Sequence, residues 1–96
     1  TLESVTSAAA GVMKSMPADF RVSITDAEGK ATYPISGFTY LLVYQKMDAQ
    51  KGPKLIRFLN WAIKDGQKMA EPLSYAPLPK ALIAKVEAKI KEIKAE

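Results

Sequence analysis

The chain has 96 residues, of which 48% are hydrophobic and 25% are charged, a balance expected of one small globular domain rather than a disordered segment. It contains no cysteine and no histidine, which excludes disulfides, thiolate metal sites and the commonest general base of enzymes. The net charge of +4 is small for a dedicated nucleic-acid binder, and no apolar run approaches the roughly 20 residues of a membrane span.

The first element expected along the chain is an amphipathic helix that begins near Thr1 and stops at Pro17. Threonine is a common helix cap, and proline cannot continue a helix. Apolar residues recur here every three or four positions, the spacing of one helix face. They are Leu2, Val5, Ala9, Val12, Met13 and Met16.

Two extended segments are expected next. Phe20, Val22 and Ile24 alternate with polar residues, which predicts a short half-buried strand or extended segment, followed by a turn at residues 26–29. Residues 38–44 predict the strongest strand, because they are aromatic, β-branched and apolar without alternation. That pattern is typical of a central strand covered on both faces.

The second half of the chain is predicted to be helical. A helix opens at residues 52–53, where proline stands in the first turn, and ends at residues 65–66, an Asp-Gly pair. A short helical turn is expected at residues 67–71. Residues 74–79 contain two prolines and predict an extended connector.

The last predicted element is a helix over residues 80–96, with lysines and glutamates opposite an apolar stripe. Glu87 and Lys91 have the spacing of an i,i+4 ion pair. The mixture of both charges favours a helix that caps a domain, with its lysines in water, over a helix that lies on an anionic membrane.

Several residues that could form a site have simpler structural explanations. Arg21 and Lys30 are expected to be solvated loop charges rather than anion ligands. Ser36, Gly37 and Thr39 are expected to form a tight entry into the strand, with glycine allowing close backbone approach, rather than a cleft wall. Aromatic residues on the strand and on one helix are expected to pack in a core rather than to stack on bases. They are Tyr33, Tyr40, Tyr44, Phe58 and Trp61.

These elements do not make a complete fold. Three or four helices with one buried strand and one weak strand give at best a two-stranded ribbon, which is marginal even under helices. A strand covered on both faces needs hydrogen-bond partners along both edges, and each buried backbone group without a partner costs roughly 1 to 3 kcal/mol. The sequence therefore predicts that the neighbours of residues 38–44 come from elsewhere.

A family resemblance fits this expectation. Five stretches resemble, in this order, the C-terminal third of the periplasmic phosphate-binding proteins that deliver inorganic phosphate to an ABC transporter. They are TLESVTSAAAGVM, PADFRVSITDAEGK, YPISGFTYLLVYQ, FLNWAIKDGQKMAEPLSYAPLP and the lysine-rich end of the chain. The resemblance covers essentially the whole chain. It depends on several unusual short motifs at the right separations, which are YPIS at residues 33–36, WA at 61–62 with GQ at 66–67, and YAPLP at 75–79.

The resemblance implies an α/β fold with two lobes, each built on a sheet, and phosphate held in the cleft between them. All 96 residues would form one segment of it. Residues 1–32 would belong to the second lobe, residues 33–37 would cross between the lobes, and residues 38–96 would help to complete the first lobe. The partners implied are the remaining N-terminal part of the receptor and, for the complete protein, phosphate and an ABC permease in the periplasm.

The resemblance carries no phosphate ligand into this chain. In that family, phosphate is bound by backbone N–H groups and hydroxyls at helix N-termini, an arginine and an acidic residue, all from earlier sequence. Ser36-Gly37 precedes Phe38 and a strand, rather than the helix of a phosphate loop. We therefore expect no catalytic, ligand-binding or metal residue and no cofactor.

Two roles remain open from the sequence. The chain is either a structural portion of a phosphate receptor or an independent interaction module that dimerises by exchanging its strand, because identical chains can satisfy each other's open edges. An enzyme is not expected, since histidine, cysteine and paired carboxylates are missing. We expect the chain by itself to associate with its own copies or with its missing portion.

Overall fold

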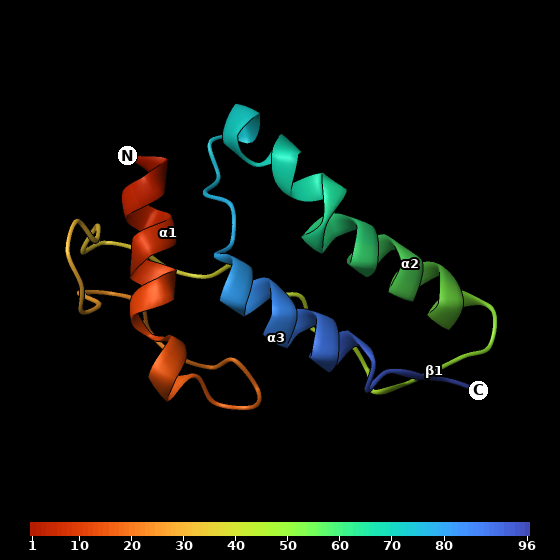
Figure 1. Ribbon diagram of the computed structural model, residues 1–96. Helices are drawn as coiled ribbons and strands as arrows, with labels where there is room; N and C mark the ends of the chain where they lie inside the picture. The colour runs from red at the N-terminus through yellow and green to blue at the C-terminus, as the bar shows by residue number, and fades with distance from the viewer.

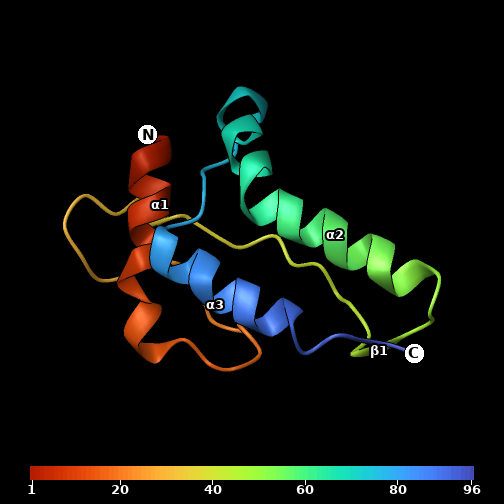
Figure 2. The ribbon, with the colours of Figure 1, turned by 45° about the vertical axis from the view of Figure 1, so that its right-hand side comes forward.

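The structure is a computed structural model that describes all 96 residues. Its three α-helices are α1 (Leu2–Gly11), α2 (Lys51–Ile63) and α3 (Lys80–Ile90). Three short 3-10 helices, η1 (Met13–Ser15), η2 (Asp65–Met69) and η3 (Glu71–Leu73), and two short strands, β1 (Lys46–Met47) and β2 (Lys94–Ala95), complete the fold. Helices α2 and α3 lie side by side and run in opposite directions, with α1 at one end (Figures 1 and 2).

The beginning of α1 confirms the expected cap. The Thr1 hydroxyl accepts a hydrogen bond from the backbone N–H of Ser4 at 3.2 Å, and the Ser4 side chain bonds back to the backbone of Thr1. This reciprocal arrangement satisfies donors that a helix start leaves free. Helix α1 ends at Gly11, earlier than the predicted stop at Pro17, and the separate 3-10 helix η1 covers Met13–Ser15.

Helix α2 also begins and ends where the sequence indicates. The Asp48 carboxylate accepts hydrogen bonds from the backbone N–H groups of Gln50 and Lys51, at 2.9 and 2.6 Å, ahead of Gly52 and Pro53 in the first turn. These contacts lower the pKa of Asp48. The short helical turn that follows is two 3-10 helices, and residues 74–79 form the expected extended connector to α3.

The end of the predicted last helix is wrong. Helix α3 stops at Ile90, and Lys94 and Ala95 form β2, which pairs in parallel with β1. The backbone N–H of Lys94 donates to the Gln45 carbonyl at 2.6 Å, so pairing with a distant strand replaces the last helical turns. This is the only sheet of the molecule. The fold is thus helix-dominated with two parallel strands.

The expected ion pair between Glu87 and Lys91 is also wrong. Glu87 instead pairs with Lys64 from the neighbouring helix end at 3.0 Å. The Lys64 ammonium lowers the pKa of Glu87. The sequence could not indicate this partner, because the side-by-side packing of α2 and α3 creates it.

Residues 20–24 are an extended segment and not a strand. The backbone of Phe20 has a φ of 62°, which interrupts β conformation. The Tyr40 hydroxyl donates to the Phe20 carbonyl at 2.9 Å, so a side chain holds this segment where a strand ladder would otherwise do so. The expected burial on one face is present at Ile24, which is 2% exposed.

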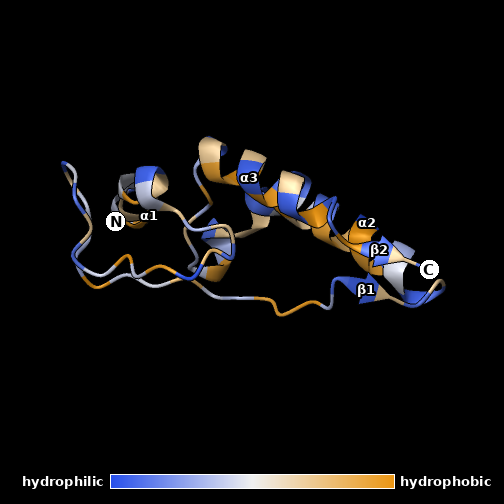
Figure 3. Cartoon of the chain, turned by 90° about the horizontal axis from the view of Figure 1, so that it is seen from below, coloured by the Kyte–Doolittle hydropathy of each residue, from blue (hydrophilic) through white to orange (hydrophobic).

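Residues 38–44 are extended but do not form the predicted central strand. No backbone N–H or C=O group of residues 37–44 makes a hydrogen bond within the chain. Leu42 is 97% exposed, Tyr44 83% and Leu41 68%, so the expected cover on both faces is missing. Figure 3 shows this segment running apart from the helices as an unaccompanied trace. These residues supply no strand beside it, and the expectation that its neighbours lie outside them stays a prediction.

The core is small and divided into two clusters, because only nine residues are buried. The N-terminal cluster centres on Ala8, Val12 and Ile24, and the C-terminal cluster on Leu59, Ile63 and Ile90. Phe38 packs against the first and Val43 against the second, so residues 37–44, which we call the open segment, bridge the two clusters. No helix in this fold combines the length and hydrophobicity that crossing a bilayer requires.

Candidate functional site

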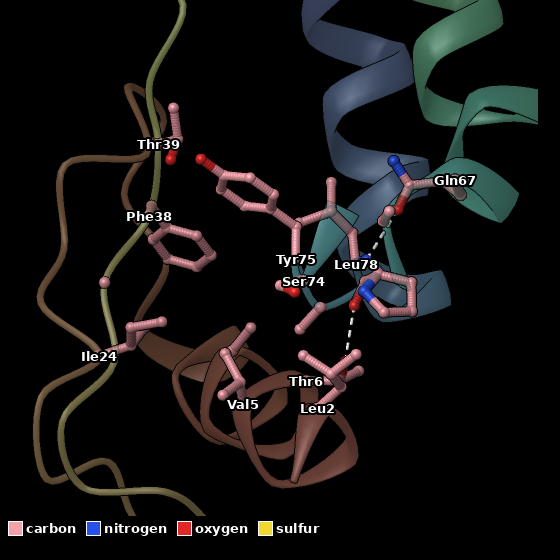
Figure 4. Close-up of a pocket in the computed structure, with 15 residues that line it drawn as sticks. Leu2, Val5, Thr6, Ile24, Phe38, Thr39, Gln67, Ser74, Tyr75 and Leu78 are labelled. Atoms are coloured by element: carbon pink, nitrogen blue, oxygen red, sulfur yellow. Dashed lines mark hydrogen bonds between the residues drawn. The ribbon is translucent and has the colours of Figure 1, made fainter. Parts of the chain in front are cut away.

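A cavity of about 340 Å³ lies where α1, the open segment and the connector meet. Val5 and Thr6 contribute one wall, Gly37 to Thr39 a second, and Ser74 to Leu78 a third. In Figure 4 the aromatic ring of Tyr75 extends from the connector toward the side of Phe38 and Thr39. The cavity therefore lies at the junction of two parts of the chain that have separate cores.

Gln67 fixes the connector wall of this cavity. Its amide nitrogen donates to the Ala62 carbonyl at 2.9 Å, and its amide oxygen accepts from the backbone N–H of Leu78 at 2.8 Å. Gly66 allows the required turn to lie close to Trp61, because a Cβ at Gly66 would stand 3.1 Å from the indole ring. These residues belong to the short motifs at residues 61–62, 66–67 and 75–79 that carry the family resemblance. The structure gives them a shared role in positioning the connector.

The α1 wall is joined to the connector by one side-chain hydrogen bond. The Thr6 hydroxyl donates to the Pro77 carbonyl at 2.7 Å, across 71 residues of sequence (Figure 4). Ser74 enters the connector with a φ of 65°, a left-handed conformation that turns the chain out of η3. Together these features hold the connector against α1.

The chemistry that this cavity offers is limited. Its walls are mainly apolar, and none of its lining side chains carries a charge. The Thr6 hydroxyl and the Gln67 amide already have partners, while the hydroxyls of Thr39 and Tyr75 make no hydrogen bond within the chain. An anion would find no compensating cation here. No cluster of carboxylates suited to a metal ion is present.

The structure separates the three residues that the sequence groups at the strand entry. Gly37 and Thr39 line the cavity, whereas the Ser36 hydroxyl donates to the Tyr33 carbonyl at 2.8 Å. Nothing lies within 4 Å of a Cβ built on Gly37, so the expected close backbone approach at this glycine is wrong. The cleft-wall alternative describes Gly37 and Thr39 better.

The charged loop residues behave as expected. Arg21 forms an exposed ion pair with Asp19 at 2.7 Å, and this contact lowers the pKa of the aspartate. Lys30 is exposed in the following turn. Neither lies on the wall of the cavity. An exposed pair of this kind contributes little to stability.

The aromatic residues do not pack in a core, so that expectation is wrong for this chain by itself. Phe58 and Trp61 stack on each other on an exposed face of α2, with ring centroids 6.0 Å apart. Tyr33, Tyr40 and Tyr44 are also exposed. Their burial would need surfaces that these 96 residues do not supply.

A larger apolar groove, which sequence reasoning did not locate, borders the open segment. Its volume is about 1180 Å³, and it runs between residues 19–22 and 38–45 on one side and helices α2 and α3 on the other. Two acidic and two basic residues, Asp19, Glu92, Arg21 and Lys89, also line it, so its charges balance. The apolar run at residues 38–44 was the only sign of this groove in the sequence. It could not predict the groove itself, because a groove exists only when the segment lies at some distance from α2 and α3.

Comparison with known proteins gives a consistent set of relatives. The chain is 37% identical over 87 residues to a protein of Xylella fastidiosa strain 9a5c named phosphate-binding protein PstS. The matched region is 90% of this chain and 24% of that relative. It is 36% identical to the protein of the same name from strain Temecula1, with the same coverage. It is 30% identical to the Pasteurella multocida protein of that name over 97% of this chain and 28% of the relative.

The chain thus spans about a quarter of the length of the curated relatives it matches. No protein-family model matches it. No solved structure matches it either. The resemblance to phosphate-binding proteins is confirmed by these relatives, all of whose names describe binding.

Proposed function

The chain is homologous to phosphate-binding proteins over nine-tenths of its length, and from this premise we propose that it is the C-terminal portion of a phosphate receptor. In this proposal the chain binds no phosphate itself. It completes one lobe and contributes to the crossing between lobes, while residues outside these 96 hold the anion. Its role is structural, and the complete protein is a binding protein rather than an enzyme.

The observation that carries the proposal is the state of residues 37–44. They are extended and apolar, and no backbone group among them is hydrogen-bonded. A native fold leaves very few buried backbone groups without partners, because each costs roughly 1 to 3 kcal/mol. Such a segment is stable in an interior only beside other strands. The relatives are about four times as long as the matched region, so a polypeptide of their length has enough further sequence to supply these neighbouring strands.

The two hydrophobic clusters support the proposed division of the chain. The N-terminal cluster includes residues of α1 and Ile24, within the second-lobe part, residues 1–32. The C-terminal cluster includes Leu59 and Ile90, within the first-lobe part, residues 38–96. The crossing at residues 33–37 is short and exposed apart from Ser36, as a link between two lobes requires.

The partners follow from the same proposal. The complete receptor would carry inorganic phosphate in the periplasm to an ABC permease, and this chain would contact the remaining N-terminal part directly. The groove of about 1180 Å³ beside residues 38–45 supports such a contact, because a partly apolar groove with balanced charge suits packed strands better than a charged ligand. The homology does not favour an independent interaction module.

The test compares the 96-residue chain with the longest natural polypeptide that contains it. Isothermal titration with inorganic phosphate should show binding by the longer polypeptide and none by the 96 residues. At concentrations where the 96-residue chain is monomeric, hydrogen exchange should show the amides of residues 38–44 protected only in the longer polypeptide, while the α2 amides around Leu59 serve as a control protected in both.

Two outcomes of these measurements would contradict the proposal. One is phosphate binding of equal affinity by the 96 residues. The other is rapid exchange at residues 38–44 in the longer polypeptide, because a strand within a sheet cannot exchange as fast as an unpaired segment. A natural gene product limited to these 96 residues would also overturn it.

A further inference from the structure

We propose that residues 37–44 form a self-complementary docking surface, and that a second copy of this chain pairs with it in antiparallel orientation when the 96 residues are on their own. The inference concerns a surface and does not depend on the receptor role. It rests on three features of this segment: its free backbone, its lack of charge and its residue order.

The backbone is the first feature. Residues 37–44 are already extended, and none of their N–H or C=O groups has a partner within the chain. An extended segment of this kind is a template for another strand. Two identical copies related by a two-fold axis present the same edge to each other, and a closed pair results. The outward direction is open, since Leu42 is 97% exposed.

The second feature is the absence of anything that blocks pairing. Proteins protect free edges with charged residues, prolines or bulges. Residues 37–45 contain no charged residue and no proline, and the nearest ones are Pro34 and Lys46. The groove beside the segment carries two acidic and two basic side chains, so it adds no net charge next to the paired edge.

The third feature is the residue order, which favours one register. An antiparallel pair centred on Leu41 places Leu41 opposite its own copy, Tyr40 opposite Leu42, and Phe38 opposite Tyr44. Aromatic, aliphatic and β-branched residues make the favourable cross-strand pairs of sheets. In a symmetric dimer the Tyr40–Leu42 and Phe38–Tyr44 pairs each occur twice, and Leu41 meets its own copy once on the axis, so the symmetry doubles every contact except the central one.

The first experiment measures association of the 96-residue chain by sedimentation equilibrium over a range of concentrations. A reversible dimer is expected. Leu42→Lys should weaken it about tenfold or more, because the charge enters the paired face twice and cross-strand neighbours set the strength of pairing. Leu73→Lys is the matched control: it makes the same change at another exposed leucine, in η3, and should leave association unchanged.

The second experiment uses the absence of cysteine from the chain. Under mild oxidation, Leu41→Cys should form a disulfide-linked dimer, because residues directly opposite each other in an antiparallel pair have Cβ atoms about 5 Å apart. Tyr44→Cys should cross-link poorly, since its two copies lie at opposite ends of the pair. Leu73→Cys should not cross-link.

A monomer at every concentration overturns the proposal, and then the rest of a longer polypeptide is the only occupant left for this surface. Equal cross-linking of Leu41→Cys and Leu73→Cys also overturns it. Cross-linking of Tyr44→Cys as fast as Leu41→Cys overturns the antiparallel register in favour of parallel pairing. None of these results bears on phosphate binding by the longer polypeptide, so the two proposals fail separately.

Discussion

Gly52 in the first turn of α2 lies directly against Ala95 of β2. A Cβ on Gly52 would stand 2.7 Å from the Cβ of Ala95 and 3.0 Å from the Cβ of Met47 in β1. The absence of a side chain at this one position therefore lets both strands rest on the start of the helix. The pairing of β1 with β2 and the packing of α2 depend on the same small space.

Gly52→Ala is therefore expected to destabilise the chain, although alanine is the better helix former. Overpacking of this kind costs roughly 1 to 3 kcal/mol. Urea unfolding followed by circular dichroism measures the change. Gly37→Ala is the control, because nothing lies within 4 Å of its Cβ, and it should leave stability unchanged or raise it by about 0.4 to 1 kcal/mol. Equal effects at both glycines would refute the close packing at Gly52.

Gln67→Ala should detach the connector from the end of α2. The change leaves the Ala62 carbonyl and the Leu78 N–H without their partner, at an expected cost of about 1 to 3 kcal/mol in the free energy of unfolding. Gln67→Glu keeps an acceptor for Leu78 but loses the donor to Ala62, so its effect should be intermediate. Gln50→Ala, an exposed glutamine whose side chain has no partner, should have none. A Gln67→Ala protein as stable as Gln50→Ala would argue against this clamp.

Leucines of the core and of the open segment should respond differently to truncation. Leu59→Ala removes a buried side chain from the C-terminal cluster and should cost about 2 to 5 kcal/mol. Leu42→Ala should change the stability of the monomeric chain by less than about 0.5 kcal/mol, because its side chain is exposed. In the longer polypeptide the receptor proposal predicts that Leu42→Ala costs as much as Leu59→Ala. Thermal unfolding at concentrations where the chain is monomeric distinguishes these outcomes.

Acid should destabilise the chain through Asp48 and Glu87. Their pKa values are lowered in the folded state, by the backbone N–H of Lys51 and by the Lys64 side chain respectively. The unfolded chain therefore binds more protons, so the stability they contribute is fully present above their ordinary pKa values of 3.8 and 4.5 and is lost as pH falls through the folded values.

Unfolding curves between pH 2 and 7 should show this loss below roughly pH 4.5. Glu87→Gln should make the decline shallower, because one of the three carboxylates with lowered pKa values, Asp19, Asp48 and Glu87, no longer titrates. Glu71→Gln, which changes a glutamate that makes no ion pair, should leave the curve as it is. A decline equally steep in Glu87→Gln would show that the Lys64 contact does not contribute.

The sequence predicts best what is determined locally. Thr1 and Pro53 mark the starts of two helices through a side-chain cap and a fixed backbone angle, and the structure confirms both starts. The errors arise where distant residues decide. Lys94 leaves the helical pattern because β1 offers it a carbonyl, and Glu87 finds Lys64 because two helices pack.

The candidate cavity and groove show the same limit. The sequence indicated that residues 38–44 need neighbours, and it associated Gly37 with a close approach that the structure does not contain. The wall formed by Thr6 and Pro77 joins residues far apart in sequence, so no local pattern could reveal it. The expectation that no phosphate ligand lies in this chain stays a prediction.

The pairing of Lys46 with Lys94 has a consequence for the order of folding. The two residues are separated by about half of the chain, so bringing them together early would carry a large loop-closure entropy. Helices α2 and α3 are close in sequence and can dock first, which shortens the remaining search. The parallel strands should then close last on the way to the native state and open first in its fluctuations, which makes the far end of the helical pair the most labile part of the C-terminal half.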